Sequence, residues 1–69
     1  MAAKAEISIY DRVRVVTARF EHEGVRPGMR GYVIAKYPDG NLEIEVSDPS
    51  TGESIALVAA TPDDVELDG

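Results

Sequence analysis

Residues 30–46 read RGYVIAKYPDGNLEIEV, and this stretch decides the fold. Two runs rich in β-branched and aromatic residues flank a segment, 38–41, whose proline, glycine and asparagine favour a tight turn. Aliphatic and acidic residues alternate strictly in the second run, so its aliphatic side chains point one way and Glu43 and Glu45 point the other. The stretch therefore predicts a β-hairpin with an apolar face for a core and an acidic face for solvent.

Shorter strands are predicted on both sides of this hairpin. Apolar and basic residues alternate within 11–18, the apolar run 54–60 is short enough for a buried strand, and 65–67 alternates again. Turn residues fill 48–53, whereas the polar segment 19–28 has no clean period and is predicted to be a long first loop. These five short strands indicate a sandwich or a barrel.

A helix-start pattern precedes the last strand. Thr61 can cap, Pro62 suits the first helical position, and Asp63 and Asp64 place acids in the first turn. Because so few residues remain, this segment is predicted to form a single 3₁₀ turn. The predicted fold is all-β, a small five-stranded barrel over 9–69 that follows a flexible N-terminus over 1–8.

The alternation also predicts which side chains form the core. Residues 54–60 have no polar alternation, so the facing of Ile55 and Val58 is left open. The predicted core consists of Val13, Val15, Val25, Val33, Ala35, Leu42, Ile44, Val46, Leu57, Val65 and Leu67.

Composition excludes several classes of protein. The chain has 69 residues and no cysteine, so disulfides and thiolate metal sites are excluded. With a single histidine, His22, no zinc site is expected, and no cofactor is implied. No apolar run approaches the ~20 residues of a membrane span. No secretion signal is visible at the start, and the lack of cysteine fits a cytoplasmic protein.

Charge is distributed unevenly along the chain. The net charge is -6, yet all seven basic residues lie at or before Lys36, and nine acids with no base follow Pro38. An acidic protein repels a phosphate backbone on average, so nucleic acid is not the expected main ligand. The expected partner is another protein with a basic surface.

Four motifs carry a resemblance to a known family. They are the glycine-containing segment 26–33, the turn Asp39-Gly40, the strand segment 43–46, and the closing segment 61–67. From Ile9 to Leu67 the chain resembles a family of small stand-alone bacterial proteins of unknown function with SH3-like barrels. The resemblance implies an SH3-like fold and a regulatory or antitoxin-like role. Ribosomal and translation-factor KOW domains share this barrel type, and they imply an RNA-associated alternative.

The leading functional hypothesis is a non-catalytic, acidic protein-binding module. Phe20 in the first loop is interpreted either as an exposed anchor or as a lid over the barrel end. His22, between two glutamates, is interpreted as a solvated loop residue in preference to an acid–base catalyst. The candidate protein-binding residues are Phe20, Glu21, His22, Glu23, Glu43, Glu45, Asp48, Glu53, Asp63 and Asp64.

Two alternatives stay open. In the RNA-associated alternative a basic strip would bind phosphates and stack bases. Its residues would be Arg12, Arg14, Arg30, Lys36 and Tyr37. In the other alternative the chain is a homo-oligomer or an enzyme-accessory subunit, in which exposed sheet edges pair. The expected state in solution is a monomer or a weak homo-oligomer.

Overall fold

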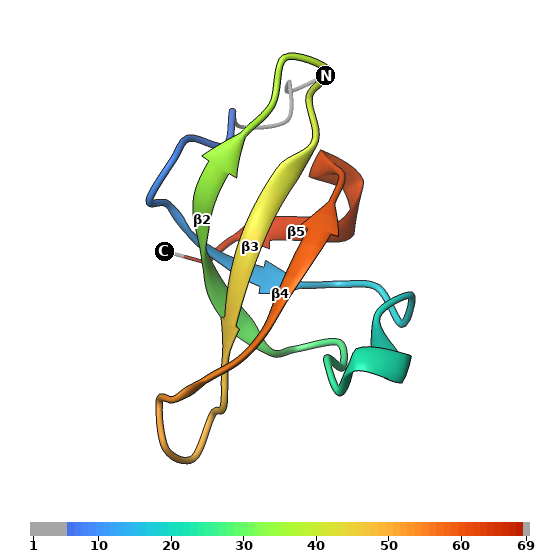
Figure 1. Cartoon of the computed structure of the whole chain (residues 1–69), viewed down its shortest axis with the longest axis vertical. Helices are drawn as coiled ribbons and strands as arrows, with labels where there is room; N and C mark the ends of the chain where they lie inside the picture. Colours follow the sequence, from blue (N-terminus) through green and yellow to red (C-terminus); the bar gives the residue numbers. More distant parts are fainter. Residues whose placement is uncertain (1–5, 69) are drawn as a thin grey trace.

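The computed structural model describes residues 6–68, which form a single antiparallel sheet of five strands. β2, β3 and β4 run along the long axis of the molecule, and β1 and β5 cross them (Figure 1). The spatial order is β4-β3-β2-β1-β5, so the predicted all-β class and strand number are confirmed. The strands are β1 (Arg12–Val15), β2 (Arg30–Lys36), β3 (Leu42–Ser47), β4 (Ser54–Ala60) and β5 (Val65–Leu67).

The sheet has two edges, β4 and β5, which do not pair with each other. The closed barrel that the sequence predicts is therefore not confirmed. Near this open side, the backbone N–H of Val16 donates to the Asp64 carbonyl at 2.9 Å. One Arg19 amino group also donates to the Ala59 carbonyl of β4 at 3.5 Å. These two contacts connect the segment after β1 to β4 and to the chain that joins β4 and β5.

The hairpin predicted over residues 30–46 is present as β2 and β3. Its turn is closed by hydrogen bonds between Tyr37 N–H and the Asn41 carbonyl (2.8 Å) and between Gly40 N–H and the Tyr37 carbonyl (2.9 Å). Gly40 has a φ of +92°, which glycine adopts without steric cost. The register then shifts between Val33 and Ala35, where β2 is irregular.

Gly31 in β2 marks a close approach between backbones. A Cβ at this position would lie inside van der Waals contact with the Glu45 carbonyl oxygen and 3.0 Å from Ile44 Cγ2. Glycine inside a strand usually marks a bulge or a close approach of backbones, and here the structure has the close approach. The pairing of Gly31 with Val46 is thus possible only because residue 31 has no side chain.

The core fills the inner face of the bent sheet. Most of the predicted core is buried, and the buried apolar side chains also include Ile7, Phe20, Val58 and Ala60. The prediction is wrong for Leu57 and Leu67, which are 53% and 40% exposed. Ala35 is half-buried, and Ile55 is exposed.

Register explains why Leu57 lies outside the core. Val58 pairs with the buried Ile44, so it faces inward, and Leu57 pairs with the outward-facing Glu45. Successive side chains of a strand point to opposite faces, so both members of each cross-strand pair share a face. Leu67 faces Val13 from the edge strand β5, where fewer neighbours cover it.

The N-terminal segment contributes to the fold. The predicted flexible terminus covers 1–8, of which residues 1–5 lie outside the described residues. Ile7 is buried, and its carbonyl accepts a hydrogen bond from Lys36 Nζ at 3.0 Å.

Tyr10, three residues further along the chain, is 79% exposed and has a φ of +72°, an uncommon conformation for a residue with a side chain.

The long first loop is more ordered than its polar sequence indicates. It contains η1, a 3₁₀ turn at Glu21–Glu23 that ends at Gly24 with a φ of +82°. The carbonyl of Phe20 accepts hydrogen bonds from the N–H groups of Glu23 and Val25, at 2.9 and 3.2 Å. Val25 is buried as predicted. No helix within residues 6–68 has the length and apolarity to cross a membrane.

The 3₁₀ turn predicted before the last strand is confirmed as η2, Pro62–Asp64. Asp64 and Thr61 form a reciprocal capping box, in which the Asp64 carboxylate accepts from the Thr61 N–H at 2.8 Å. Arg19 then pairs with the same carboxylate at 2.6 Å. The Arg19 hydrogen bond, with help from Thr61, holds the pKa of Asp64 below its usual range against the opposing effect of burial.

Candidate functional site

The outer face of β2, β3 and β4 carries the acidic residues that the hairpin sequence predicts. Glu45 lies between Tyr32 of β2 and Leu57 of β4 in the cross-strand register. Glu43 lies between Ala35 and Ala59. Glutamates therefore occupy the middle strand, with uncharged side chains on both sides. We call this surface the acidic face, and it consists of Tyr32, Ile34, Glu43, Glu45, Ile55 and Leu57.

The flanks of the acidic face are apolar and open to solvent. Tyr32 and Leu57 are 48% and 53% exposed, and Ile34 and Ile55 also count among the exposed large apolar residues. Single exposed apolar residues are common on protein surfaces, but contiguous groups often mark interaction sites. β4 adds a second feature, because it is an edge strand without a charged residue. An uncharged edge strand can accept a further strand.

Ion pairs neutralise most bases of the described chain but leave the acidic face charged. The partners of these bases lie near the two ends of the chain. Within residues 6–68 no ion pair joins Glu43 or Glu45 to a base. The pairs are Arg12 and Arg30 with Asp68, Arg14 with Glu66, Arg19 with Asp64, and Lys36 with Glu6.

Tyr37 lies next to the acidic face and contacts one of its carboxylates. Its hydroxyl donates a hydrogen bond to Glu43 Oε2 at 3.1 Å. This bond and the charge of Glu43 raise the pKa of the Tyr37 phenol, so that it stays protonated. Tyr37 therefore acts as a neutral hydrogen-bond donor to Glu43 and leaves the negative charge in place.

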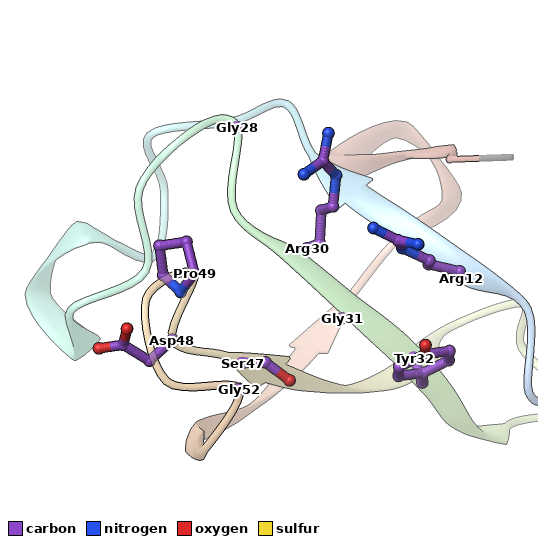
Figure 2. Close-up of a pocket in the computed structure, with 9 residues that line it drawn as sticks. All are labelled: Arg12, Gly28, Arg30, Gly31, Tyr32, Ser47, Asp48, Pro49 and Gly52. Carbon is purple, nitrogen blue, oxygen red and sulfur yellow. The ribbon is translucent and has the colours of Figure 1, made fainter.

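A pocket adjoins the acidic face at Tyr32. It has a volume of about 390 Å³ and lies between the outer side of β1 and β2 and the turn that joins β3 to β4 (Figure 2). Arg12, Arg30 and Tyr32 line one side, and Ser47, Asp48 and Pro49 line the other. Three glycines complete the wall, and one of these is Gly31. We call this site the arginine pocket.

Asp68 fixes the two arginines of this pocket. Its Oδ2 lies 3.1 Å from Arg12 Nε and 2.8 Å from Arg30 Nε, and its backbone N–H donates to the Arg12 carbonyl at 2.9 Å. The carboxylate is mostly buried, at 16% exposure, whereas the Arg12 and Arg30 side chains are 50% and 56% exposed. The sequence analysis missed this arrangement, because it depends on the pairing of β1 with both β2 and β5.

Most of the predicted loop site lies at the surface, with one exception. Phe20 is only 4% exposed, and the Arg19 guanidinium lies 4.4 Å above its ring. The interpretation of Phe20 as an exposed anchor is therefore wrong, because it packs in the core. Glu21, His22 and Glu23 are exposed on η1, where His22 Nε2 lies 3.5 Å from Glu23 Oε2.

The other predicted acids separate into surface and structural positions. Glu53 and Asp63 are exposed, and Asp48 is half-buried, with its carboxylate accepting from Ser50 and Thr51 N–H groups at 2.7 and 3.2 Å. Asp64 is only 8% exposed, and its carboxylate accepts hydrogen bonds from Arg19 and from the Thr61 N–H, so in this fold it has a structural position.

The basic strip of the RNA-associated alternative is not continuous. Arg14 and Arg30 are cross-strand neighbours, and Arg12 adjoins Tyr32 in the same way. Lys36 instead lies at the other end of β2, where it contacts Glu6. Within the described residues, no group of three or more potential metal ligands is present.

Comparison of the chain with protein-family models, with curated proteins and with solved structures found no match. The SH3-like resemblance therefore rests on the sequence motifs, and the functional argument rests on the acidic face and the arginine pocket.

Proposed function

We propose that this protein is a non-catalytic protein-binding module on an SH3-like scaffold. Its acidic face binds a partner that presents basic residues within an apolar surface. The observation that carries the proposal is the position of Glu43 and Glu45, which have no basic partner in the described chain and stand between exposed apolar side chains.

Electrostatics supports a basic partner over an acidic or neutral one. Charged residues across an interface attract the correct partner and repel wrong ones, and they act strongly on the rate of encounter. Glu43 and Glu45 are only partly exposed, so a partner that covers them must supply compensating positive charge. Lysines or arginines set among aliphatic residues would do this.

The apolar flanks support an extended contact area. Tyr32 supplies an aromatic side chain of the type that often dominates binding energy, and Leu57 supplies the most exposed aliphatic one on this face. A regulatory, antitoxin-like role would follow from the same chemistry. A module of this charge would cover a basic surface through which its partner binds nucleic acid.

The test compares two variants with the same change in charge. Glu43→Lys plus Glu45→Lys reverses the charge of the acidic face, and Glu21→Lys plus Glu23→Lys reverses two exposed acids on η1. The natural partner is isolated by pull-down at low salt, identified and purified, and its affinity for each variant is measured by calorimetry. We expect the first variant to lose at least about tenfold, or ~1.4 kcal/mol, and the second to bind as the wild type does.

Equal affinity of all three proteins would refute the role of the acidic face. Equal loss in both variants would show a nonspecific effect of net charge and would also refute it. Light scattering tests the competing occupant of this face. A dimer that Leu57→Lys dissociates would show that a second copy covers β4, and the proposal of a basic partner would then be overturned.

A further inference from the structure

The arginine pocket has its own chemistry, distinct from that of the acidic face. Each guanidinium has five N–H donors in a planar fork. The Asp68 contact recorded for Arg12 and for Arg30 is at the Nε atom. Within residues 6–68, no hydrogen bond engages the terminal amino groups of these two arginines. Figure 2 shows both side chains rising from the same side of β1 and β2.

The local charge of the pocket is positive in an otherwise acidic protein. Two guanidinium groups and one carboxylate, Asp68, leave a surplus of one positive charge. Asp48 also lines the pocket, but its carboxylate points away from the two arginines (Figure 2) and accepts from the N–H groups of Ser50 and Thr51. The pocket therefore favours a ligand with one negative charge.

The shape of the donors favours a carboxylate. Guanidinium groups bind planar carboxylates through paired, charge-assisted hydrogen bonds. The Asp68 carboxylate already lies against both arginines through a single oxygen, Oδ2, so these guanidinium groups are already placed beside a carboxylate. A phosphate chain would need many neutralising contacts, and the net charge of -6 opposes it. A pocket of about 390 Å³ is within the size range of small-ligand sites.

We propose that the pocket between Arg12, Arg30 and Tyr32 binds a single carboxylate of a peptide, from an acidic side chain or from a chain end. The terminal amino groups of Arg12 and Arg30 hold the carboxylate, and Tyr32 packs on the adjoining apolar part. Asp68 lies against both guanidinium groups and lowers the positive charge of the site. This site does not depend on Glu43 and Glu45, so it can be tested and refuted independently of the proposed function.

The test follows the Nε–Hε signals of the arginines by NMR during titration of ¹⁵N-labelled protein. The probes are acetyl-Gly-Glu-Gly-amide for a side chain, acetyl-Gly-Gly-Gly for a chain end, acetyl-Gly-Gln-Gly-amide as the neutral match, and inorganic phosphate. We expect saturable shifts at Arg12 and Arg30 with one of the carboxylates, at a Kd of about 1 mM. The glutamine peptide should bind at least about tenfold more weakly.

Three variants distinguish binding from a merely structural role of the pair. Arg30→Gln should abolish the shifts, whereas Arg14→Gln, on the same face but outside the pocket, should keep them. Asp68→Asn raises the local charge by one and should tighten carboxylate binding about threefold or more, because a like charge leaves the site. A structural ion pair alone would give no such tightening.

Several outcomes would overturn the inference. Absence of saturable shifts up to about 50 mM carboxylate, far above the expected Kd, would refute the site. Preferential binding of phosphate would refute the carboxylate assignment, and equal binding of the glutamine peptide would refute the role of charge. Loss of affinity in Asp68→Asn, with the signal dispersion of a folded protein retained, would assign Asp68 a purely structural role and would also count against the inference.

Discussion

Of the glycines in this chain, Gly31 should be the one at which an added methyl group lowers the free energy of unfolding most. A Cβ at residue 31 would overlap the Glu45 carbonyl oxygen and come within 3.0 Å of the Glu45 carbonyl carbon and of Ile44 Cγ2. The first two of these atoms belong to the backbone of β3, so they cannot rotate away as the end of a side chain could. Gly31→Ala must therefore separate β2 from β3 near the Gly31–Val46 pair.

The cost has two parts and one small offset. Overpacking a dense region costs about 1–3 kcal/mol, and a weakened ladder hydrogen bond costs about 0.5–1.5 kcal/mol. Alanine also lowers the conformational entropy of the unfolded chain, which stabilises the folded state by about 0.4–1 kcal/mol. The central values of these terms give a net loss of about 2 kcal/mol. A chain of 69 residues has a free energy of unfolding of about 3–10 kcal/mol, so the loss is a large fraction of the total.

Urea unfolding followed by far-UV circular dichroism measures this loss, and it suits a chain without tryptophan. With a slope of about 1 kcal/mol per M, the midpoint should fall by about 2 M. Gly40→Ala is the matched control, because residue 40 has open space around it but a φ of +92°. It should cost about 1–2 kcal/mol through backbone strain alone. A Gly31→Ala variant within about 0.5 kcal/mol of the wild type would refute the steric argument.

Two further substitutions test the capping box and the strained turn. Asp64→Asn should cost about 1–2 kcal/mol at pH 7, because it removes the carboxylate that pairs with Arg19 and weakens the capping box. Because the folded-state pKa of Asp64 lies below its usual value, its contribution is present above the unfolded-state pKa of about 4 and is lost as the pH falls through the folded-state pKa. Urea titrations should show the gap to the wild type closing on acidification, and a gap that stays constant across the acid range would contradict this. Tyr10→Gly should stabilise by up to about 1 kcal/mol, because the positive φ is relieved and the exposed ring makes few contacts. Thermal unfolding measures it, and a clear destabilisation would mean that the ring packs.

The hairpin could be predicted from sequence because each local signal agreed. Alternation placed the aliphatic side chains of β3 inside, and the turn residues 38–41 matched the turn that forms. The facing of β4 could not be predicted in the same way, because its run of aliphatic and alanine residues has no polar alternation to mark which face is buried. Only the pairing of Val58 with Ile44 shows that Leu57 is on the outside.

The burial of Phe20 could not be predicted from the sequence, for a different reason. Its neighbours in sequence are polar, and this context indicates an exposed loop residue. The burial of Phe20 comes from the chain that folds around it, with η1 on one side and the Arg19 guanidinium above the ring. No local pattern records that contact, because the Arg19 side chain is itself held in place by Asp64 at the other end of the chain.

The strand order explains where the acidic surplus of this chain resides. β5 pairs with β1, not with β4, so the acids of the C-terminal segment meet the arginines that precede the hairpin. Glu66 is directly opposite Arg14, and Asp68 reaches both arginines of the pocket. Glu66 and Asp68 are therefore paired with bases, whereas Glu43 and Glu45 of β3 have no basic partner within residues 6–68. An uneven charge distribution along the chain thus becomes two neighbouring surfaces of opposite sign, the acidic face and the arginine pocket, which meet at Tyr32. A partner that engaged both would need a base and an acid at fixed spacing, and such a requirement selects against partners of a single charge sign.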